Sequence, residues 1–253
     1  MFTWRSLPRR PLIIAHRGSS AVAPENTLAA FSQAIADCAD GIEIDVRLSR
    51  DNEVIVIHDG RLERTTNGRG RVKDSSLREL KKLSAGTWFH KKFSSEKIPT
   101  LAEVFELVRG AVGINIEIKT EHGRAQRKEI LTRCMEVVRQ HRASEYVLIS
   151  SFHHPFVQQA KILDSKITTG VLYHPVHHLR RSPGALTAHS HADFFICNKY
   201  SLHKRTVQKL RERGIRVGVY VINTKKAFEK FAEMKVDCVY TDNPAALTTP
   251  SRL

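Results

Sequence analysis

Cysteine is scarce in this chain, which has four in 253 residues: Cys38, Cys134, Cys197 and Cys238. All four are isolated in the sequence, and none belongs to a Cys-x-x-Cys pair. A disulfide framework or a zinc knuckle is therefore not expected, and buried free thiols are predicted instead.

Long hydrophobic runs are also missing. The first apolar run covers only residues 12–15, which is too short for the core of a signal peptide, and no later run approaches the length of a membrane span. A hydrophobic content of 41% is nevertheless enough for a packed core. We therefore expect a soluble, cytoplasmic protein without stable membrane insertion.

The chain lacks a concentrated basic segment, although its formal net charge is +15. Its Lys and Arg residues occur in scattered groups such as Lys91-Lys92, Arg180-Arg181 and Lys225-Lys226. No basic helix interleaved with aromatic residues is visible, so no nucleic-acid partner is expected. We interpret the charge as favouring solubility and attracting anionic substrates. The oligomeric state does not follow from the sequence.

Strand-like and helix-like patterns alternate along the chain. Strands are predicted at residues 12–15, 41–46, 114–118, 147–150, 168–173, 194–197, 216–222 and 237–240. Helices are predicted at residues 26–37, 101–109, 126–141, 155–163, 204–213 and 225–234. Eight strands in about 250 residues fit a closed (β/α)8 TIM barrel, an α/β fold, better than an open sheet. We expect a single domain over residues 1–253.

One stretch interrupts the alternation. A second apolar run, residues 53–57, follows the second predicted strand and ends at His58-Asp59. Residues 60–99 are then polar and rich in turns, with one short helical piece near residues 76–83. We predict a small insertion after the second strand that covers one mouth of the barrel as a lid or binding loop.

Polar residues, three of them acidic, occupy every second position in two of the predicted strands. Glu43 and Asp45 alternate with Ile42, Ile44 and Val46, and Glu117 alternates with isoleucines at positions 114, 116 and 118. Because the apolar face of a barrel strand meets the helices, the acidic side chains must point into the barrel. They lie near the carboxyl ends of the strands, where barrel enzymes place their chemistry.

Three clustered carboxylates repel one another, so either protonation or a cation must compensate. Lys119 and Arg17 could neutralise part of the charge. A donor set of oxygens alone suits a hard divalent cation, Mg²⁺ or Ca²⁺. A purely structural cluster of salt bridges is the alternative interpretation.

Two histidines, His16 and His58, end apolar runs beside these carboxylates. A divalent cation, Arg17, Lys119 and two imidazoles together describe a site for a phosphate ester, in which the imidazoles exchange protons near neutral pH. The chain has no Walker loop, and Gly68-Arg69-Gly70 is typical of a turn.

The ordered motifs HRG, PENT, IEIDV, IHD with LERTTNGRG, IPTL and NIEIK closely resemble those of the glycerophosphodiester phosphodiesterases. Ser150-Ser151-Phe152, the strand that ends at Asn198, Tyr220-Val221-Ile222-Asn223 and VDCVYTDNP continue the resemblance. It covers nearly the whole chain and is closest to the short cytoplasmic bacterial members.

The resemblance implies a TIM barrel that hydrolyses glycerophosphodiesters to glycerol 3-phosphate and an alcohol with a divalent cation. It implies an acid/base pair of His16 and His58, and metal ligands at Glu43, Asp45 and Glu117. It further implies phosphate binding by Arg17 and Lys119. Many members have Trp-Thr-x-Asn where this chain has Tyr220-Val221-Ile222-Asn223, which affects the shape of an aromatic wall and the preference for the alcohol.

Other polar and aromatic residues have two readings. Phe152 and Tyr220 either line a substrate pocket or pack in the core, and Asn198 is a weaker candidate for substrate binding. Glu25 either favours the dipole of a helix capped by Asn26 or pairs with Arg17. Zinc binding is not expected of the loop histidines, and their role stays open: His153, His154, His174, His177 and His178.

Two other functions remain open at this point. One is a lysophospholipase D-type phosphodiesterase that acts on lysophospholipids at membranes, and the other is a barrel that binds phosphorylated ligands without chemistry. The sequence does not identify the cation, the alcohol, the histidine that acts as the acid, or a cyclic phosphate intermediate.

Overall fold

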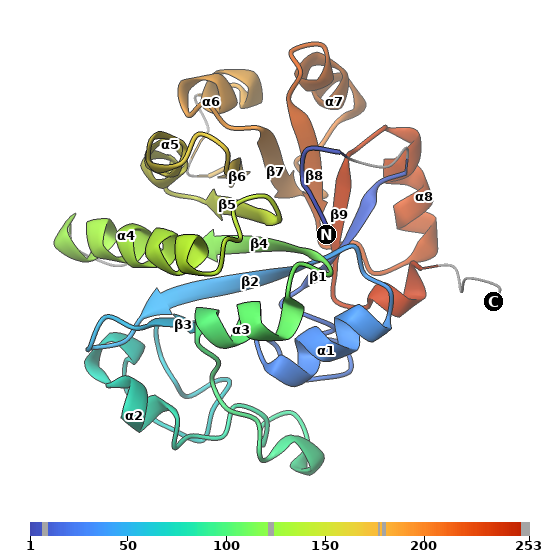
Figure 1. Cartoon of the computed structure of the whole chain (residues 1–253). Coiled ribbons are helices and arrows are strands. Elements are labelled where there is room, and N and C mark those ends of the chain that lie inside the picture. The colour runs from blue at the N-terminus through green and yellow to red at the C-terminus, as the bar shows by residue number, and fades with distance from the viewer. Residues whose placement is uncertain (7–9, 121–123, 177, 179–180, 249–253) are drawn as a thin grey trace.

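The computed structural model describes residues 1–6, 10–120, 124–176, 178 and 181–248, and for residues 124–127 only the backbone. Figure 1 shows strands at the centre of a ring of helices. The strands are β1 (Leu12–His16), β2 (Gly41–Leu48), β3 (Val54–Val56), β4 (Gly113–Ile118), β5 (Val147–Ser151), β6 (Thr168–Tyr173), β7 (Phe194–Asn198), β8 (Arg216–Tyr220) and β9 (Cys238–Thr241). The helices are α1 (Leu28–Ala36), α2 (Leu77–Leu80), α3 (Leu101–Val108), α4 (Arg124–Gln140), α5 (His154–Leu163), α6 (Pro183–His189), α7 (Lys204–Arg211) and α8 (Lys225–Glu233).

The predicted (β/α)8 barrel is confirmed. Parallel pairing runs from β1 through β9, β8, β7, β6, β5 and β4 to β2, and β2 pairs again with β1, which closes the barrel. The short strand β3 lies outside this circle and pairs antiparallel with β2. Helix α6 was not predicted from the sequence.

Strand alternation separates two apolar layers. Ile42, Ile44 and Val46 of β2 join the layer between the strands and the helices. Ile14, Leu148, Phe194 and other side chains fill the barrel interior. The barrel therefore has a packed core, and only the end beyond the carboxyl termini of its strands is free for polar chemistry.

The first residues of the chain close the opposite end of the barrel. Trp4 is fully buried and packs edge to face against Phe2 and Phe194, with ring centroids 5.2 and 5.8 Å away. Its indole N–H donates to the carbonyl of Tyr146 at 2.9 Å. The N-terminus accordingly lies over the centre of the ring in Figure 1.

The insertion between β3 and α3 has a small core of its own. Leu62, Val72, Leu80 and Ile98 pack there against Ile55, which precedes the insertion. Within it, α2 starts with a capping box in which Ser76 and Glu79 exchange hydrogen bonds. In Figure 1 the insertion lies beside β2 and β3, at the edge of the barrel.

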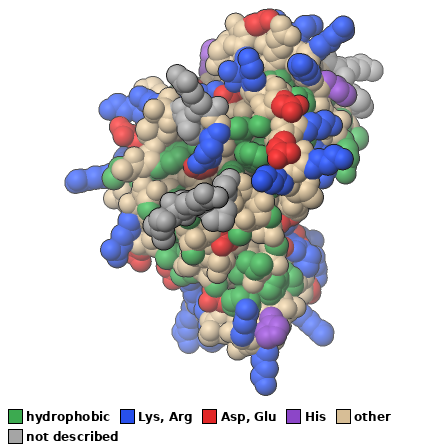
Figure 2. Space-filling view, turned by 90° about the vertical axis from the view of Figure 1, so that its right-hand side faces the viewer, with side chains coloured by type: hydrophobic (Ala, Val, Ile, Leu, Met, Phe, Trp, Pro, Cys, Tyr) green, Lys and Arg blue, Asp and Glu red, His purple; other side chains and the backbone are tan. Residues whose placement is uncertain are grey.

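Basic side chains are spread over the surface. On the face shown in Figure 2, Lys and Arg project from many separate places and do not gather in one patch. Among the described residues, no helix combines the length and hydropathy that crossing a bilayer requires.

Candidate active site

A cavity of about 200 Å³ lies at the carboxyl ends of the barrel strands. Its lining includes eight of the ten site residues predicted from the sequence: His16, Arg17, Glu43, His58, Glu117, Lys119, Phe152 and Tyr220. Asp45 lies behind this lining with 1% of its side chain exposed. Asn198 is not part of the lining, and its side-chain oxygen accepts hydrogen bonds from the backbone of Tyr200 and Ser201.

Strand register brings the three carboxylates together. Asp45 of β2 is paired with Glu117 of β4, and Glu43 lies two residues earlier on the same face of β2. One carboxylate oxygen from each residue lies within 4.8 Å of the others. Among the described residues, this is the group whose geometry suits a metal ion.

The charges and hydrogen bonds of this cluster suit a divalent cation. Lys119 Nζ lies 2.8 Å from Asp45 Oδ1 and also contacts Glu117. Glu43 Oε2 accepts the backbone N–H of Arg17 at 3.0 Å, whereas Glu43 Oε1 is buried without a hydrogen-bond partner among the described residues. A buried carboxylate oxygen without a donor is costly, and a hard cation would satisfy it.

The pKa values of the two β2 carboxyls move in opposite directions. Burial, together with the negative charge of Asp45, raises the pKa of Glu43. Burial alone would also raise the pKa of Asp45, but the charges of Lys119 and Arg17 outweigh it and lower that pKa. The cations of the protein therefore compensate Asp45 far better than Glu43.

Each of the two histidines is held by a carboxylate through Nδ1. His16 Nδ1 lies 2.8 Å from Asp242 Oδ1, and His58 Nδ1 lies 2.6 Å from Asp59 Oδ1. With Nδ1 occupied, Nε2 is the nitrogen of each ring that remains for proton transfer in the cavity. The arrangement resembles the way a carboxylate fixes the tautomer of a general-base histidine.

The two imidazoles differ in their electrostatic surroundings. Burial would lower the pKa of His16, but its hydrogen bond to Asp242 and the charge of Glu43 more than compensate, so that pKa is raised. Burial lowers the pKa of His58, and the attraction of Asp45 does not offset this. The pair therefore combines a more basic and a less basic ring at one cavity.

Arg17 is placed by an unusual turn after β1. Its backbone is left-handed, with φ 57°, and so is that of Gly18, with φ 82°. A Cβ at Gly18 would lie 2.7 Å from the backbone of Ala30, so this close approach requires glycine. The Arg17 guanidinium donates to Glu25 at 2.9 Å, which confirms the pairing that the sequence left open.

Asn26 does not cap helix α1. Its backbone is left-handed, with φ 57°, and its side-chain amide donates to Asp45 Oδ2 at 2.8 Å. Thr27 is the N-cap, and its hydroxyl accepts from Ala30 N. The prediction of an Asn26 cap is therefore wrong, because the amide of Asn26 is used to hold a cluster carboxylate.

The other side of the cavity is apolar. Phe152 and Tyr220 line it together with Leu172 and Ile196, and the two aromatic rings pack against the barrel interior. Each aromatic residue therefore both lines the cavity and packs in the core, so the two interpretations do not exclude each other. A cavity with charged groups on one side and apolar groups on the other suits a ligand with a phosphate and a less polar part.

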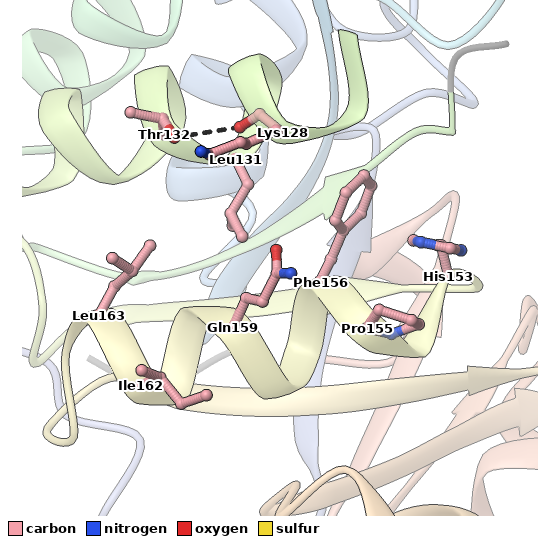
Figure 3. A pocket seen from close by; sticks show the side chains of 9 residues that line it. All are labelled: Lys128, Leu131, Thr132, His153, Pro155, Phe156, Gln159, Ile162 and Leu163. Carbon is pink, nitrogen blue, oxygen red and sulfur yellow. Dashed lines mark hydrogen bonds between the residues drawn. The ribbon is translucent and has the colours of Figure 1, made fainter. Parts of the chain in front are cut away.

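A larger hollow of about 620 Å³ lies outside the barrel between α4 and α5 (Figure 3). Its described lining is mainly apolar, with Leu131, Phe156 and Leu163 in Figure 3, and no carboxylate is found among these described residues. His153 is the one imidazole among the described residues of this lining. The described residues of the hollow do not pair acid and base groups as the barrel cavity does, so we place the chemistry in the smaller cavity.

The other loop histidines make structural contacts. His154 stacks on His178 with ring centroids 4.6 Å apart, and its Nε2 lies 2.9 Å from the carbonyl oxygen of Leu172. The backbone nitrogen of His174 lies 3.1 Å from His178 Nδ1. His177 and Arg180 are outside the described residues.

Several site residues were missed from the sequence. Asp242 and Asp59 orient the histidines, and Asn223 donates to Asp242 at 2.8 Å. Asp59 was available as the residue next to His58. Asp242 and Asn223 lay in the quoted VYTDNP and Tyr-Val-Ile-Asn motifs, but only folding brings them to His16.

Comparison with known proteins identifies the same group of enzymes. The model of the glycerophosphoryl diester phosphodiesterase family matches residues 16–246. A glycerophosphodiester phosphodiesterase of Caldanaerobacter subterraneus is 37% identical over 244 residues, which cover 94% of this chain and 96% of the relative. A putative glycerophosphodiester phosphodiesterase of Bacillus subtilis is 36% identical over 92% of this chain and 94% of its own.

Solved structures agree with these sequence matches. A phosphodiesterase of Oleispira antarctica, in complex with its product sn-glycerol-3-phosphate, superposes with a TM-score of 0.86 at 32% identity. The match covers 94% of this chain and 95% of that chain. A glycerophosphodiester phosphodiesterase of Agrobacterium tumefaciens gives a TM-score of 0.79 at 28% identity, over 94% and 98% of the two chains.

Proposed function

Because this chain belongs to the glycerophosphoryl diester phosphodiesterase family, we propose that it hydrolyses glycerophosphodiesters to glycerol 3-phosphate and an alcohol. In this proposal a divalent cation is bound by Glu43, Asp45 and Glu117. His16 and His58 transfer the protons, and Arg17 and Lys119 bind the phosphate.

One observation carries the proposal. The three carboxylates have ligand atoms within 4.8 Å of one another, and two carboxylate-oriented imidazoles line the same cavity. A structural cluster of salt bridges would not need an oxygen on Glu43 that is buried without a hydrogen-bond partner among the described residues. Nor would phosphate binding alone need two imidazoles that are each held through Nδ1.

The ionic groups divide the work between binding and charge compensation. A bound divalent cation would neutralise charge on the phosphoryl oxygens. Arg17, whose guanidinium is already held by Glu25, can present its remaining N–H groups to the phosphate. Lys119 can shift from the carboxylates to the substrate once the cation compensates Asp45 and Glu117.

The two imidazoles can serve as base and acid for the two ends of the reaction. One takes a proton from the attacking oxygen at its Nε2, and the other gives a proton to the oxygen of the leaving alcohol. The attacking oxygen belongs either to water or to the substrate's own glycerol hydroxyl, which would form a cyclic phosphate first. Phe152 and Tyr220 would face the leaving alcohol.

Phosphorus NMR of glycerophosphocholine hydrolysis tests the proposal. We expect glycerol 3-phosphate to appear, and a transient cyclic phosphate would identify attack by the substrate hydroxyl. His16→Ala and His58→Ala should each lower kcat at least about 100-fold, because proton transfer contributes about 10²- to 10⁴-fold. Glu106→Gln, on an exposed position of α3, is the control and should be fully active.

Removal and replacement of the metal test the cation. EDTA should abolish turnover, and titration with Mg²⁺ and with Ca²⁺ should show which ion restores it. Glu43→Gln should weaken the binding of that ion in calorimetry, because the variant removes one charged ligand. Full activity of His58→Ala in excess EDTA would contradict both the metal and the acid/base assignment.

A panel of substrates and a vesicle-binding assay separate the other two functions. Faster turnover of lysophospholipids, together with binding to anionic vesicles, would select the lysophospholipase D-type activity. Recovery of unchanged glycerophosphodiester after long incubation with either cation would select a binding protein.

A further inference from the structure

One arginine outside the cavity joins the two loops that carry site residues. Arg64 lies in the insertion, has 44% of its side chain exposed and is not part of the cavity lining. Its guanidinium contacts Asp59 at 2.6 and 3.1 Å and Glu25 at 2.8 and 2.9 Å. Two bidentate contacts fix a planar group far more firmly than one surface ion pair.

Each of these two carboxylates holds a side chain that faces the cavity. Asp59 Oδ1 lies 2.6 Å from His58 Nδ1, and Glu25 Oε1 accepts from Arg17 Nη1 at 2.9 Å. Glu25 belongs to the turn between β1 and α1, whereas Asp59 follows β3. Arg64 therefore connects a proton-transfer group and a phosphate-binding group that come from different parts of the chain.

We propose that Arg64 is a positioning residue that sets the spacing between the His58 imidazole and the Arg17 guanidinium. This inference rests on the function proposed above. Without Arg64, Asp59 and Glu25 would face each other as like charges, and each loop would lose its tie to the other. A misplacement of about 1 Å at a reacting group can cost about 100-fold in rate.

Geometry and charge make different predictions at this position. A lysine would keep the positive charge, but its ammonium cannot form two bidentate contacts to carboxylates that lie on different sides. If spacing is what matters, Arg64→Lys should be nearly as impaired as Arg64→Ala. If charge alone matters, lysine should restore most of the activity.

Steady-state kinetics of the full-length protein test the inference, with glycerophosphocholine as substrate and the activating cation in excess. Arg64→Ala should lower kcat about 30- to 100-fold while KM changes less than about threefold, because Arg17 and Lys119 still bind the phosphate. The kcat of Arg64→Lys should exceed that of Arg64→Ala by less than about threefold. Arg61→Ala is the matched control, since Arg61 is an exposed arginine of the same segment that pairs with Glu63 at 2.7 Å.

A double-mutant cycle shows whether Arg64 acts through its partners. In an Asp59→Asn background, Arg64→Ala should lower kcat by less than about one third of its effect in the wild type. Equal effects in the two backgrounds, a wild-type kcat in Arg64→Ala, or full rescue by lysine would each overturn the inference. The melting temperature of Arg64→Lys should match that of Arg61→Ala. Its lower kcat would then not be caused by unfolding.

The wild type distinguishes this inference from the function on which it rests. If the wild-type protein forms no glycerol 3-phosphate from any glycerophosphodiester, the proposed function fails. If the wild type is active and Arg64→Ala equals it, the function stands and only the role of Arg64 is refuted.

Discussion

Replacing Asp242 by asparagine should leave His16 in place but protonate it on the wrong nitrogen. Asn223 Oδ1 accepts hydrogen bonds from Thr241 Oγ1 at 3.0 Å and from the Asp242 backbone at 2.9 Å. Its amide nitrogen must therefore be the atom that donates to Asp242 Oδ2 at 2.8 Å. In Asp242→Asn the new carbonyl oxygen has to face this donor, so the new NH₂ group faces His16 Nδ1.

The size of the effect follows from this geometry. A hydrogen bond to a charged group contributes about 1.5–3 kcal/mol, and its loss alone lowers a rate about 10- to 150-fold. His16 would also have to accept at Nδ1 and carry its proton at Nε2, where it can no longer act as a base. In serine proteases the corresponding change lowers kcat about 10⁴-fold. We expect kcat of Asp242→Asn to fall between about 10² and 10⁴-fold.

A second substitution should reverse part of the loss. In the double variant Asp242→Asn/Asn223→Asp, the carboxylate at 223 accepts from the NH₂ group of residue 242, and the carbonyl of residue 242 turns to His16. The proper tautomer returns without the negative charge, so kcat should rise at least about tenfold above the single variant. The assay is the release of glycerol 3-phosphate, with ¹⁵N NMR of the histidine ring to identify the protonated nitrogen.

Two results would refute this reasoning. If Asp242→Asn keeps kcat within about threefold of the wild type, the contact between His16 and Asp242 does not serve the reaction. If the double variant is no better than the single one while both fold, the tautomer is not what the substitution changes.

Three further predictions concern packing and the thiols. Trp4→Ala should lower the free energy of unfolding by about 3–5 kcal/mol in urea titrations, because it empties the closed end of the barrel. Gly18→Ala should cost more than about 1 kcal/mol and lower activity, since φ is +82° and the new Cβ would meet Ala30; a neutral result would contradict the close approach. In the native protein only Cys38 should react rapidly with a thiol reagent, and all four cysteines should react after unfolding, because burial raises the pKa of Cys134 and Cys197 to about 12.

Periodic patterns made the barrel predictable. Each β-strand alternates between two environments, so the period of two in residues 41–46 and 113–118 reveals both the strand and the direction of its acidic side chains. Structure confirms that Glu43 and Glu117 face the cavity. Helix α6 escaped prediction because it has only seven residues and begins with Pro-Gly, which is also typical of a turn.

Contacts distant in sequence could not be predicted in the same way. His16 and Asp242 are 226 residues apart, and no local pattern states which acid will meet which histidine. Asn26 shows a related limit, because an asparagine before a helix is a common cap and only the tertiary fold brings Asp45 to its side chain. At Asn198, a weaker candidate for substrate binding, the side-chain oxygen accepts hydrogen bonds from the backbone of a local turn.

The closing of β1 against β9 also has a consequence for how the protein is made on the ribosome. His16 is synthesised near the beginning, but its partner Asp242 and the last strand that flanks it are added more than two hundred residues later. Trp4 likewise cannot pack against Phe194 or donate to the carbonyl of Tyr146 until those residues have been synthesised. The nascent chain therefore cannot assemble a working site before β9 and Asp242 have left the ribosome, and a chain terminated before them should have neither a closed barrel nor an oriented His16.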